Sequence, residues 1–318
     1  MAMSELRAAV VGAGRLGGFH ARKYAALAGV RLTHVVDIDP ERAGALAAEL
    51  GAIALGGHRE LAGLVDLASV AAPGVCHHAI AAELMAAGID VLVEKPMAAT
   101  LAEARDLKEV ARRRGRVLQV GHLERFNPAV MRLRTIVAAP RFVECHRLAP
   151  FTERGVDVDV VLDLMVHDLD VIQCVTGAAE VTALEALGVA VLTDQIDVAN
   201  ARIRFANGLI ANLNASRVAP RSERKIRFFQ PNAYISVDYE ARRIQIYRKR
   251  PPLSGSAFST ISAEQVEFGD ADPLRDEIAA FVASVRTRTP PPVTADDGLR
   301  VMELSERIRL AMESAPPD

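Results

Sequence analysis

The chain has 318 residues, enough for about two domains of roughly 150 residues each. Half of its residues are hydrophobic and 25% are charged, a composition that excludes disordered and collagen-like chains. Its 38 basic and 40 acidic residues give a net charge of −2, so the chain has no overall positive field that could hold nucleic acid. We therefore expect no nucleic-acid partner.

The cysteines and the N-terminus favour a cytoplasmic protein. Cys76, Cys145 and Cys174 lie far apart without metal-ligand spacing, and an odd number does not suit a disulfide framework. The N-terminal residues show no basic region followed by a long apolar stretch, and no run of about 18 uncharged apolar residues occurs. We expect no metal, no signal peptide and no membrane span.

The first part of the chain, residues 1–122, alternates short apolar runs with segments of helical period. This pattern predicts a doubly wound parallel sheet, a Rossmann domain, whose strands are covered by helices on both faces. The predicted strands are Leu6–Val11, Arg31–Val36, Leu67–Ala71, Ile89–Val93 and Val117–Val120, and the predicted helices are Arg15–Ala28, Pro40–Leu50, Cys76–Ala87 and Leu101–Arg114.

The remainder, residues 123–318, predicts an α+β domain with a mainly antiparallel open sheet. Asn207-Gly208 is typical of a two-residue hairpin turn, because both residues tolerate positive φ. Pro251–Glu264 indicates a long loop. The predicted strands are 179–189, 196–206, 209–217, 224–229, 233–239 and 242–248, and the predicted helices are Val160–Val175, Pro273–Arg288 and Asp296–Glu313.

A glycine-rich turn follows the first predicted strand. Gly12-Ala13-Gly14-Arg15-Leu16-Gly17 has the spacing of a dinucleotide-binding turn, in which a pyrophosphate contacts the backbone and the N–H groups that begin the next helix. Asp37 ends the second strand, where a carboxylate accepts hydrogen bonds from a ribose and repels a 2′-phosphate. This favours NAD over NADP, although Arg42 could reach a phosphate. Alternatively, Asp37 is a surface acid.

Three further motifs stand out, and two of them carry groups that can transfer protons. Glu94-Lys95-Pro96 ends a parallel strand at the edge where such sheets hold ligands, in a chain with only five lysines. Asp163 and His167 are four residues apart and would share one face of a helix, either for proton transfer or as a structural acid and a core histidine. Asp168 and Asp170 are interpreted as solvent-facing or sugar-adjacent. The third motif is Ala72-Pro73-Gly74-Val75-Cys76-His77, which leads into a helix.

Together these motifs resemble the Gfo/Idh/MocA family of NAD(P)-dependent sugar oxidoreductases over essentially the whole chain. The resemblance implies that Lys95 lies between nicotinamide and the substrate hydroxyl, that the Lys95–Pro96 bond is cis, and that Asp163 and His167 act with Lys95 in catalysis. It also implies a homodimer or homotetramer formed through the second sheet. The implied cofactor contacts are Gly12, Ala13, Gly14, Arg15, Leu16, Asp37, Ala72, Pro73, His77, Glu94, Lys95 and Gln119.

The sequence departs from the common family pattern in two places. The stretch from Asp157 to His167 replaces a glycine-rich lead-in and the glycine between the Asp and the His, which bears on substrate shape. Gly74 stands where the family often has Asn, and Ala72 where it often has Thr. These two changes should alter the cofactor contacts only modestly.

The segment from His122 to Pro128, together with Leu162–Asp168, looks like the subgroup that oxidises the 3-hydroxyl of UDP-N-acetylglucosamine. In that subgroup the ketone feeds an aminotransferase that makes a 3-amino sugar for lipid A. The diphosphate would need positive groups, for which Arg217, Arg221, Arg224 and Lys225 are candidates unless they form a solvated rim. The expected substrate contacts are Lys95, His122, Arg125, Asn127, Asp163, His167 and Arg217.

Two other functions remain open from the residues. The first is a dehydrogenase of a free polyol or monosaccharide such as an inositol, and the second is a non-catalytic regulator that senses NAD or a sugar. Lys95, Asp163 and His167 favour an enzyme, because a sensor needs the pocket but not the groups that transfer protons.

Overall fold

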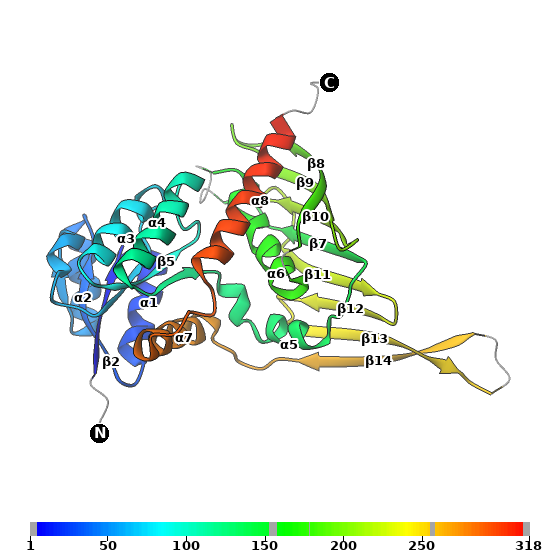
Figure 1. The fold of residues 1–318 in the computed structure, drawn as a ribbon, viewed down its shortest axis with the longest axis horizontal. Coiled ribbons are helices and arrows are strands. Elements are labelled where there is room, and N and C mark those ends of the chain that lie inside the picture. The colour runs from blue at the N-terminus through cyan, green and yellow to red at the C-terminus, as the bar shows by residue number, and fades with distance from the viewer. Residues whose placement is uncertain (1–4, 153–157, 178, 255–257, 314–318) are drawn as a thin grey trace. The chain divides into compact units, whose positions relative to one another are not determined.

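The computed structural model describes residues 5–152, 158–177, 179–254 and 258–313 (Figure 1). By its internal contacts the chain divides into two units, residues 1–126 with 272–300, and residues 127–271 with 301–318. The sequence predicted one boundary, between residues 122 and 123, which would place the segment 272–300 in the second domain. The contacts group this segment with the first unit instead. Within the described residues, no helix is both long enough and apolar enough to cross a membrane.

The first unit contains a parallel sheet with strand order β3-β2-β1-β4-β5-β6, which confirms the predicted doubly wound fold. The edge strand β3 has only three residues and was not predicted from the sequence. The strands and longer helices of the first unit are β1 (Leu6–Val11), α1 (Arg15–Ala26), β2 (Val30–Val36), α2 (Pro40–Leu50), β3 (Ile53–Leu55), β4 (Leu67–Val70), α3 (His77–Ala86), β5 (Asp90–Glu94), α4 (Leu101–Arg114), β6 (Leu118–Gly121) and α7 (Pro273–Thr287).

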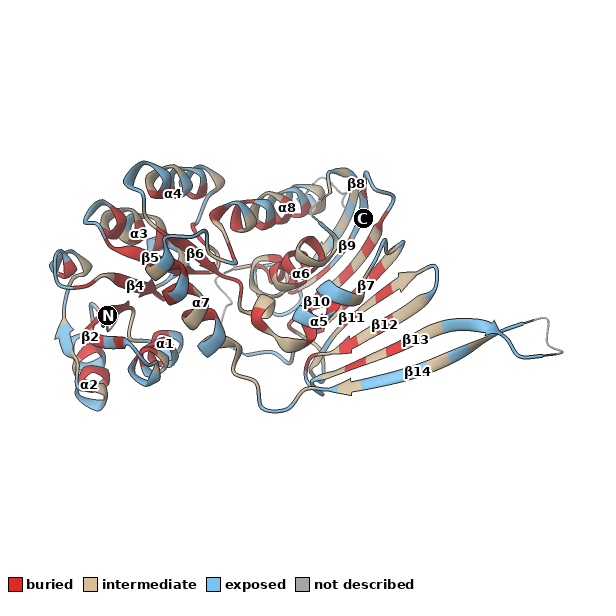
Figure 2. Cartoon of the chain, turned by 60° about the horizontal axis from the view of Figure 1, so that its bottom comes forward, coloured by how far each residue is buried: buried red, intermediate tan, exposed pale blue. Residues whose placement is uncertain are grey.

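Helices cover both faces of this sheet, which explains the continuous apolar runs of its strands (Figure 2). On one face, Tyr24 of α1 and Phe281 of α7 pack in the same core as Val10, Val35 and Leu92 of the strands. Because α7 buries its apolar side in this core, it belongs with the first unit, although in the chain it follows all the strands of the second unit. Helices α3 and α4 cover the other face.

The second unit contains a sheet whose strand order is β14-β13-β12-β11-β7-β10-β9-β8 among the described residues. Neighbouring strands are antiparallel except β7 and β10, which are parallel. Its elements are α5 (Pro128–Ile136), β7 (Phe142–Leu148), a π turn (Val161–Met165), α6 (Val166–Thr176), β8 (Val181–Val189), β9 (Val198–Phe205), β10 (Ile210–Ser216), β11 (Glu223–Gln230), β12 (Ala233–Asp238), β13 (Arg243–Pro252), β14 (Ser259–Glu267) and α8 (Ala295–Glu313), of which α8 begins in the first unit.

The predicted α+β architecture is confirmed, but several elements differ. Helix α5 and strand β7 were not predicted, and the loop predicted over Pro251–Glu264 is wrong for most of its length. There β13 continues to Pro252, and β14 pairs with it from Ser259. Most side chains of β14 are exposed, so the strand lacks the alternation by which a half-buried strand is identified.

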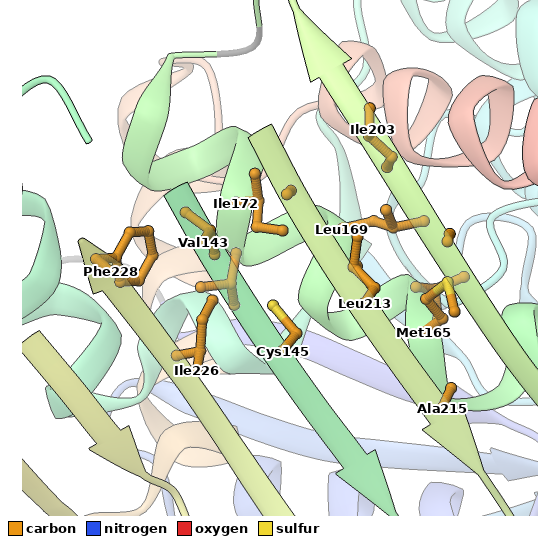
Figure 3. Packing of buried hydrophobic residues seen from close by; sticks show 14 of the residues in the cluster. Val143, Cys145, Met165, Leu169, Ile172, Ile203, Leu213, Ala215, Ile226 and Phe228 are labelled. Carbon is orange, nitrogen blue, oxygen red and sulfur yellow. The ribbon is translucent and has the colours of Figure 1, made fainter. Parts of the chain in front are cut away.

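The core of the second unit lies between its helices and one face of its sheet (Figure 3). Buried and less buried residues alternate along β7, β9 and β10, as Figure 2 shows. Leu169 and Ile172 of α6 and Met165 of the π turn point toward Cys145 of β7 and Leu213 of β10. Each fully buried side chain of this size stabilises the fold by about 1.5–3 kcal/mol.

A buried carboxylate organises the turn before β9. One oxygen of Asp197, Oδ2, accepts the backbone N–H groups of Val191 (2.8 Å), Leu192 (2.6 Å) and Thr193 (2.9 Å). The other oxygen lies 3.1 Å from Nε of the buried Arg217. Burial raises the pKa of Asp197, but these hydrogen bonds outweigh it and lower that pKa to about 2.

Replacing Asp197 by alanine should lower the free energy of unfolding by about 3–5 kcal/mol at pH 7, because the substitution removes a buried carboxylate from its cation and its backbone donors. Urea titration followed by circular dichroism measures the change. The exposed Asp194 on the same turn is the matched control, and Asp194→Ala should change stability by less than about 0.5 kcal/mol.

The difference in the free energy of unfolding between the wild-type protein and Asp197→Ala should also depend on pH. The pKa of Asp197 is about 2 in the folded protein, below the unfolded value of about 3.9. Its contribution is therefore present above about pH 4 and is lost as the pH falls toward 2. Equal stability of the two proteins at pH 7 would contradict this interpretation.

Candidate active site

Two glycines permit the turn between β1 and α1. Gly12 has a φ of +100°, and a Cβ atom there would lie 2.6 Å from the carbonyl oxygen of Ala71. A Cβ atom on Gly17 would lie 1.7 Å from the carbonyl oxygen of Gly12. Both positions therefore require glycine. A Cβ atom on Gly14 would meet no described atom within 4 Å, so the backbone there is open to a ligand.

The beginning of α1 is suited to an anion. Among the described residues, α1 has no side-chain cap and no acidic residue in its first turn. Its first N–H groups and the positive end of its dipole are thus available to a phosphate. A hollow of about 590 Å³ adjoins the turn, and Gly14, Arg15 and Arg42 are among its lining residues. The residues predicted to hold a dinucleotide therefore fit a pyrophosphate.

Asp37 lies directly beside this turn. Its Oδ2 accepts the N–H of Ala13 at 2.6 Å, and its Oδ1 accepts the N–H of Asp39 at 2.9 Å. Each oxygen keeps a second lone pair, which can accept a ribose hydroxyl. Nε of Arg42, the residue that could have favoured NADP, lies 3.0 Å from the carboxylate of Asp39, the N-cap of α2. This arrangement is consistent with NAD.

The segments that follow β4 and β5 are joined by His77. Its two ring nitrogens lie 2.8 Å from the carbonyl oxygen of Ala72 and 2.7 Å from that of Pro96. The ring therefore links two parts of the predicted cofactor surface. The peptide bond between Lys95 and Pro96 is cis, as the resemblance implied.

Two of the predicted cofactor residues face the interior of the first unit. Glu94 is buried, and its Oε1 lies 2.9 Å from Nε2 of His20. Gln119 is fully buried, and its amide donates to the carbonyl oxygen of Glu277 at 3.2 Å. These side chains support the strands β5 and β6 from within.

The segment after β6 shows how three predicted substrate residues are held. His122 is buried, and a guanidinium nitrogen of Arg125 lies 3.1 Å from the carboxylate of Asp297. Asn127 is the N-cap of α5, where its side chain accepts the N–H of Ala129 at 3.0 Å. Arg125 and Asn127 therefore have structural roles that the sequence analysis did not predict.

Asp163 and His167 do not share a regular α-helix. Asp163 lies in the π turn Val161–Met165, whereas His167 is the second residue of α6. Both are partly exposed, and His167 lies between the buried residues Val166 and Asp168. A π turn often marks a functional site, and no periodicity in the sequence indicated it. Asp157, which begins the divergent stretch, lies outside the described residues.

The interpretation of Asp168 and Asp170 as solvent-facing residues is wrong. Both are at most 2% exposed. The carboxylate of Asp168 accepts two hydrogen bonds from the guanidinium of Arg147, at 2.9 and 3.0 Å, and that guanidinium lies 5.5 Å from the ring centre of Tyr239. Because β7 was not predicted, the partner of Asp168 could not be identified from the sequence.

The four basic residues predicted to bind a diphosphate, 217, 221, 224 and 225, differ in how far they are buried. Arg217 is only 4% exposed, and its guanidinium donates to the carbonyl oxygens of Val158 (2.5 Å) and Ile196 (3.1 Å) beside Asp197. Arg217 therefore holds the fold and is not available for the predicted contact with a diphosphate. Arg221 and Arg224 are exposed, and Lys225 lies between acidic neighbours.

Comparison with known proteins agrees with this geometry. Residues 6–122 match the model of an oxidoreductase family with an NAD-binding Rossmann fold, and residues 131–236 match the GFO/IDH/MocA C-terminal domain. The UDP-N-acetylglucosamine 3-dehydrogenase of Acidithiobacillus ferrooxidans is 38% identical over 317 residues, covering 98% of this chain and 99% of that protein. The myo-inositol dehydrogenase Hyg17 of Streptomyces leeuwenhoekii is 32% identical over 229 residues, covering 67% and 70% of the two chains.

Solved structures show the same fold. The structure of the 3-dehydrogenase GnnA from Acidithiobacillus ferrooxidans has a TM-score of 0.92 and covers 98% of this chain and 99% of that one. GenD2 from gentamicin A biosynthesis, solved with NAD, has a TM-score of 0.84 at 23% identity and covers 99% and 96%. The glycine turn, the open N-terminus of α1 and Asp37 fit NAD as the cofactor. The chain therefore belongs to the GFO/IDH/MocA family of NAD-dependent oxidoreductases.

Proposed function

We propose that this protein is an NAD-dependent dehydrogenase that oxidises the 3-hydroxyl of UDP-N-acetylglucosamine to a ketone. The observation that carries the proposal is the 38% identity to the enzyme of that name, which extends over nearly the full length of both chains. It includes the second unit, where we place Asp163, His167 and the cations assigned to the diphosphate. The proposed product is a 3-keto sugar, which suits a downstream aminotransferase that makes a 3-amino sugar for lipid A.

Oxidation of a secondary alcohol removes a hydride from the carbon and a proton from the oxygen. NAD, when bound, accepts the hydride, so the protein has to orient the alcohol and take the proton. We assign these tasks to Lys95, at the end of β5, and to Asp163 and His167, in the π turn and the first turn of α6. An imidazole titrates near neutral pH and suits proton transfer, and a carboxylate can orient it or bind the sugar.

The proposed substrate contacts are polar groups after β6 and near β11, of which Arg125 and Asn127 also have the structural contacts described above. His122, Arg125 and Asn127 follow β6, the strand next to β5 in the sheet. Arg221 and Arg224 are the exposed cations that we assign to the diphosphate, in place of Arg217. Charge-assisted hydrogen bonds from guanidinium groups suit phosphate oxygens.

A panel of alcohols tests the substrate. The purified protein with NAD should form NADH with UDP-N-acetylglucosamine and not with free hexoses or inositols, and glutamate with an aminotransferase should increase the yield by removing the ketone. Reduction of the product with borodeuteride, followed by NMR, should place deuterium at carbon 3.

Each other result of the panel contradicts a specific part of the proposal. Turnover of inositols alone would retain the chemistry and discard the nucleotide, in line with the inositol dehydrogenases among the relatives. NAD binding without turnover of any alcohol would favour a sensor.

Lys95→Ala and His167→Ala should each lower kcat about 10²–10⁴-fold at saturating substrate, because each removes a group assigned to proton transfer. Steady-state NADH formation measures the loss. Lys108→Ala is the control, since Lys108 is a surface residue paired with Asp296. Lys95→Arg keeps the charge but not a titrating amine, so activity of this variant would assign the proton to His167. Unchanged kcat in both alanine variants would contradict the assignment.

We also propose that a second copy of the chain covers the sheet face opposite the core of the second unit. Four partly buried aromatic rings form a row there across β7, β11, β12 and β13, with centroids 5.0 to 5.5 Å apart in the order Phe142, Phe229, Tyr234 and Tyr247. Rings of this kind are enriched at protein interfaces.

The protein should therefore elute as a homodimer or homotetramer, and Phe229→Glu with Tyr234→Glu should reduce it to a monomer, because two charges would be buried at the interface. Size-exclusion chromatography with light scattering measures the mass. Arg113→Glu, on the exposed side of α4, should leave the oligomer intact. A monomeric wild-type protein at micromolar concentration would contradict the proposal.

A further inference from the structure

A chain of buried polar side chains runs through the first unit and ends at the backbone of Lys95. The Tyr24 hydroxyl lies 2.9 Å from the Ser69 hydroxyl, which lies 3.0 Å from Nδ1 of His20. Nε2 of His20 lies 2.9 Å from Oε1 of Glu94. The other oxygen of Glu94 accepts the backbone N–H of Lys95 at 3.3 Å. Helix α1 is thereby connected to the end of β5 through β4.

The chemistry of the groups orients this chain. Burial raises the pKa of Glu94, but the hydrogen bond and charge of His20 and the N–H of Lys95 outweigh burial, so the pKa of Glu94 stays below its usual range. An ionised carboxylate only accepts hydrogen bonds, so Nε2 of His20 carries a hydrogen whether the ring is neutral or charged. The Ser69 hydroxyl can donate to Nδ1 or accept from it. Either state leaves Glu94 held on both oxygens.

The Glu94 carboxylate lies close to Gly121 and to Glu277. Gly121 pairs with Glu94 in the sheet, and a Cβ atom on Gly121 would lie 2.9 Å from the carboxyl atoms of Glu94. A ring nitrogen of His20 and one carboxylate oxygen each of Glu94 and of Glu277 in α7 lie within 4.8 Å of one another. His20, Tyr24 and Ser69 are fully buried, so these three side chains lie beyond the reach of a substrate or a dinucleotide.

A buried carboxylate hydrogen-bonded to an imidazole is seldom the most stable way to fill a core, because desolvation of the charge offsets the favourable contact. Apolar residues at these positions would pack the same space. What the polar chain adds is a fixed carboxylate directly before Lys95, tied to the backbone of Lys95 itself. A misplacement of about 1 Å at a reacting group can cost a factor of about 10² in rate.

We propose that His20 is a positioning residue for Lys95, acting through Glu94, with Ser69 holding its imidazole and Gly121 providing the space. This inference rests on the proposed role of Lys95. It adds a function for residues that touch neither cofactor nor substrate.

A double-mutant cycle tests it. His20→Gln should lower kcat about 10- to 100-fold and leave the KM for NAD within about twofold, because the cofactor surface is untouched. Ser69→Ala removes one hydroxyl and should lower kcat less, in the same direction. In the Lys95→Ala background, assayed at high enzyme concentration, His20→Gln should have no further effect, because the group it positions is gone.

A second variant disturbs the Glu94 carboxylate through the neighbouring strand β6 instead of through His20. Gly121→Ala should displace the carboxylate and show the same loss of kcat, which should likewise disappear in the Lys95→Ala background. His34→Gln is the matched control. His34 is a buried histidine of the same unit that contacts Thr33 and takes no part in the hydrogen bonds that lead to Glu94. This substitution should leave kcat unchanged. Thermal unfolding of every variant separates a loss of fold from a loss of rate.

The outcomes distinguish the two proposals. Unchanged kcat in His20→Gln and Gly121→Ala, or an equal loss with and without Lys95, would overturn the positioning role while leaving the proposed function intact. Unchanged kcat in Lys95→Ala itself would overturn the proposed role of Lys95, and the positioning role with it.

Discussion

The first unit depends on the close approach of α1 to β1 and to the turn after β4, which only residues without a Cβ atom permit. A side chain on Gly12 or Gly17 would occupy space already filled by backbone. The approach places the beginning of α1 at the carboxyl edge of the sheet, where β1 lies between β2 and β4. The loops after these strands diverge there, and the edge is open to a ligand. Asp37, Ala72 and Lys95 follow strands that end at this same edge.

Buried charges recur at the segments that carry the proposed chemistry. Glu94 with His20 precedes Lys95, and Asp168 with Arg147 follows His167. Such pairs add little to stability, because desolvation offsets their attraction, but each accepts very few geometries. The backbone next to the proposed proton-transfer residues is thus held by directional contacts, in addition to the apolar packing that forms most of the core and tolerates more variation.

The fold leaves the choice of substrate to individual side chains. GenD2 has the same fold at 23% identity, and inositol dehydrogenases are also among the relatives of this chain. Function therefore depends on which groups the shared scaffold presents. In this chain the lead-in to His167 lacks the glycines of the common pattern and forms a π turn. The burial of Arg217 likewise shows that a cation placed at a strand end can serve the fold rather than a ligand.

The sequence alone determined the family, the doubly wound first sheet and most strands of the second, because these depend on local signals. Glycine spacing, continuous apolar runs and alternation along strands are all readable from neighbouring residues. Tertiary structure decided what local pattern does not encode. The π turn at Asp163, the strand β14 and the grouping of α7 with the first unit depend on partners distant in the chain. The same holds for charged residues: Arg217 and Asp168 look like surface groups until their partners, Asp197 and Arg147, are brought beside them by folding.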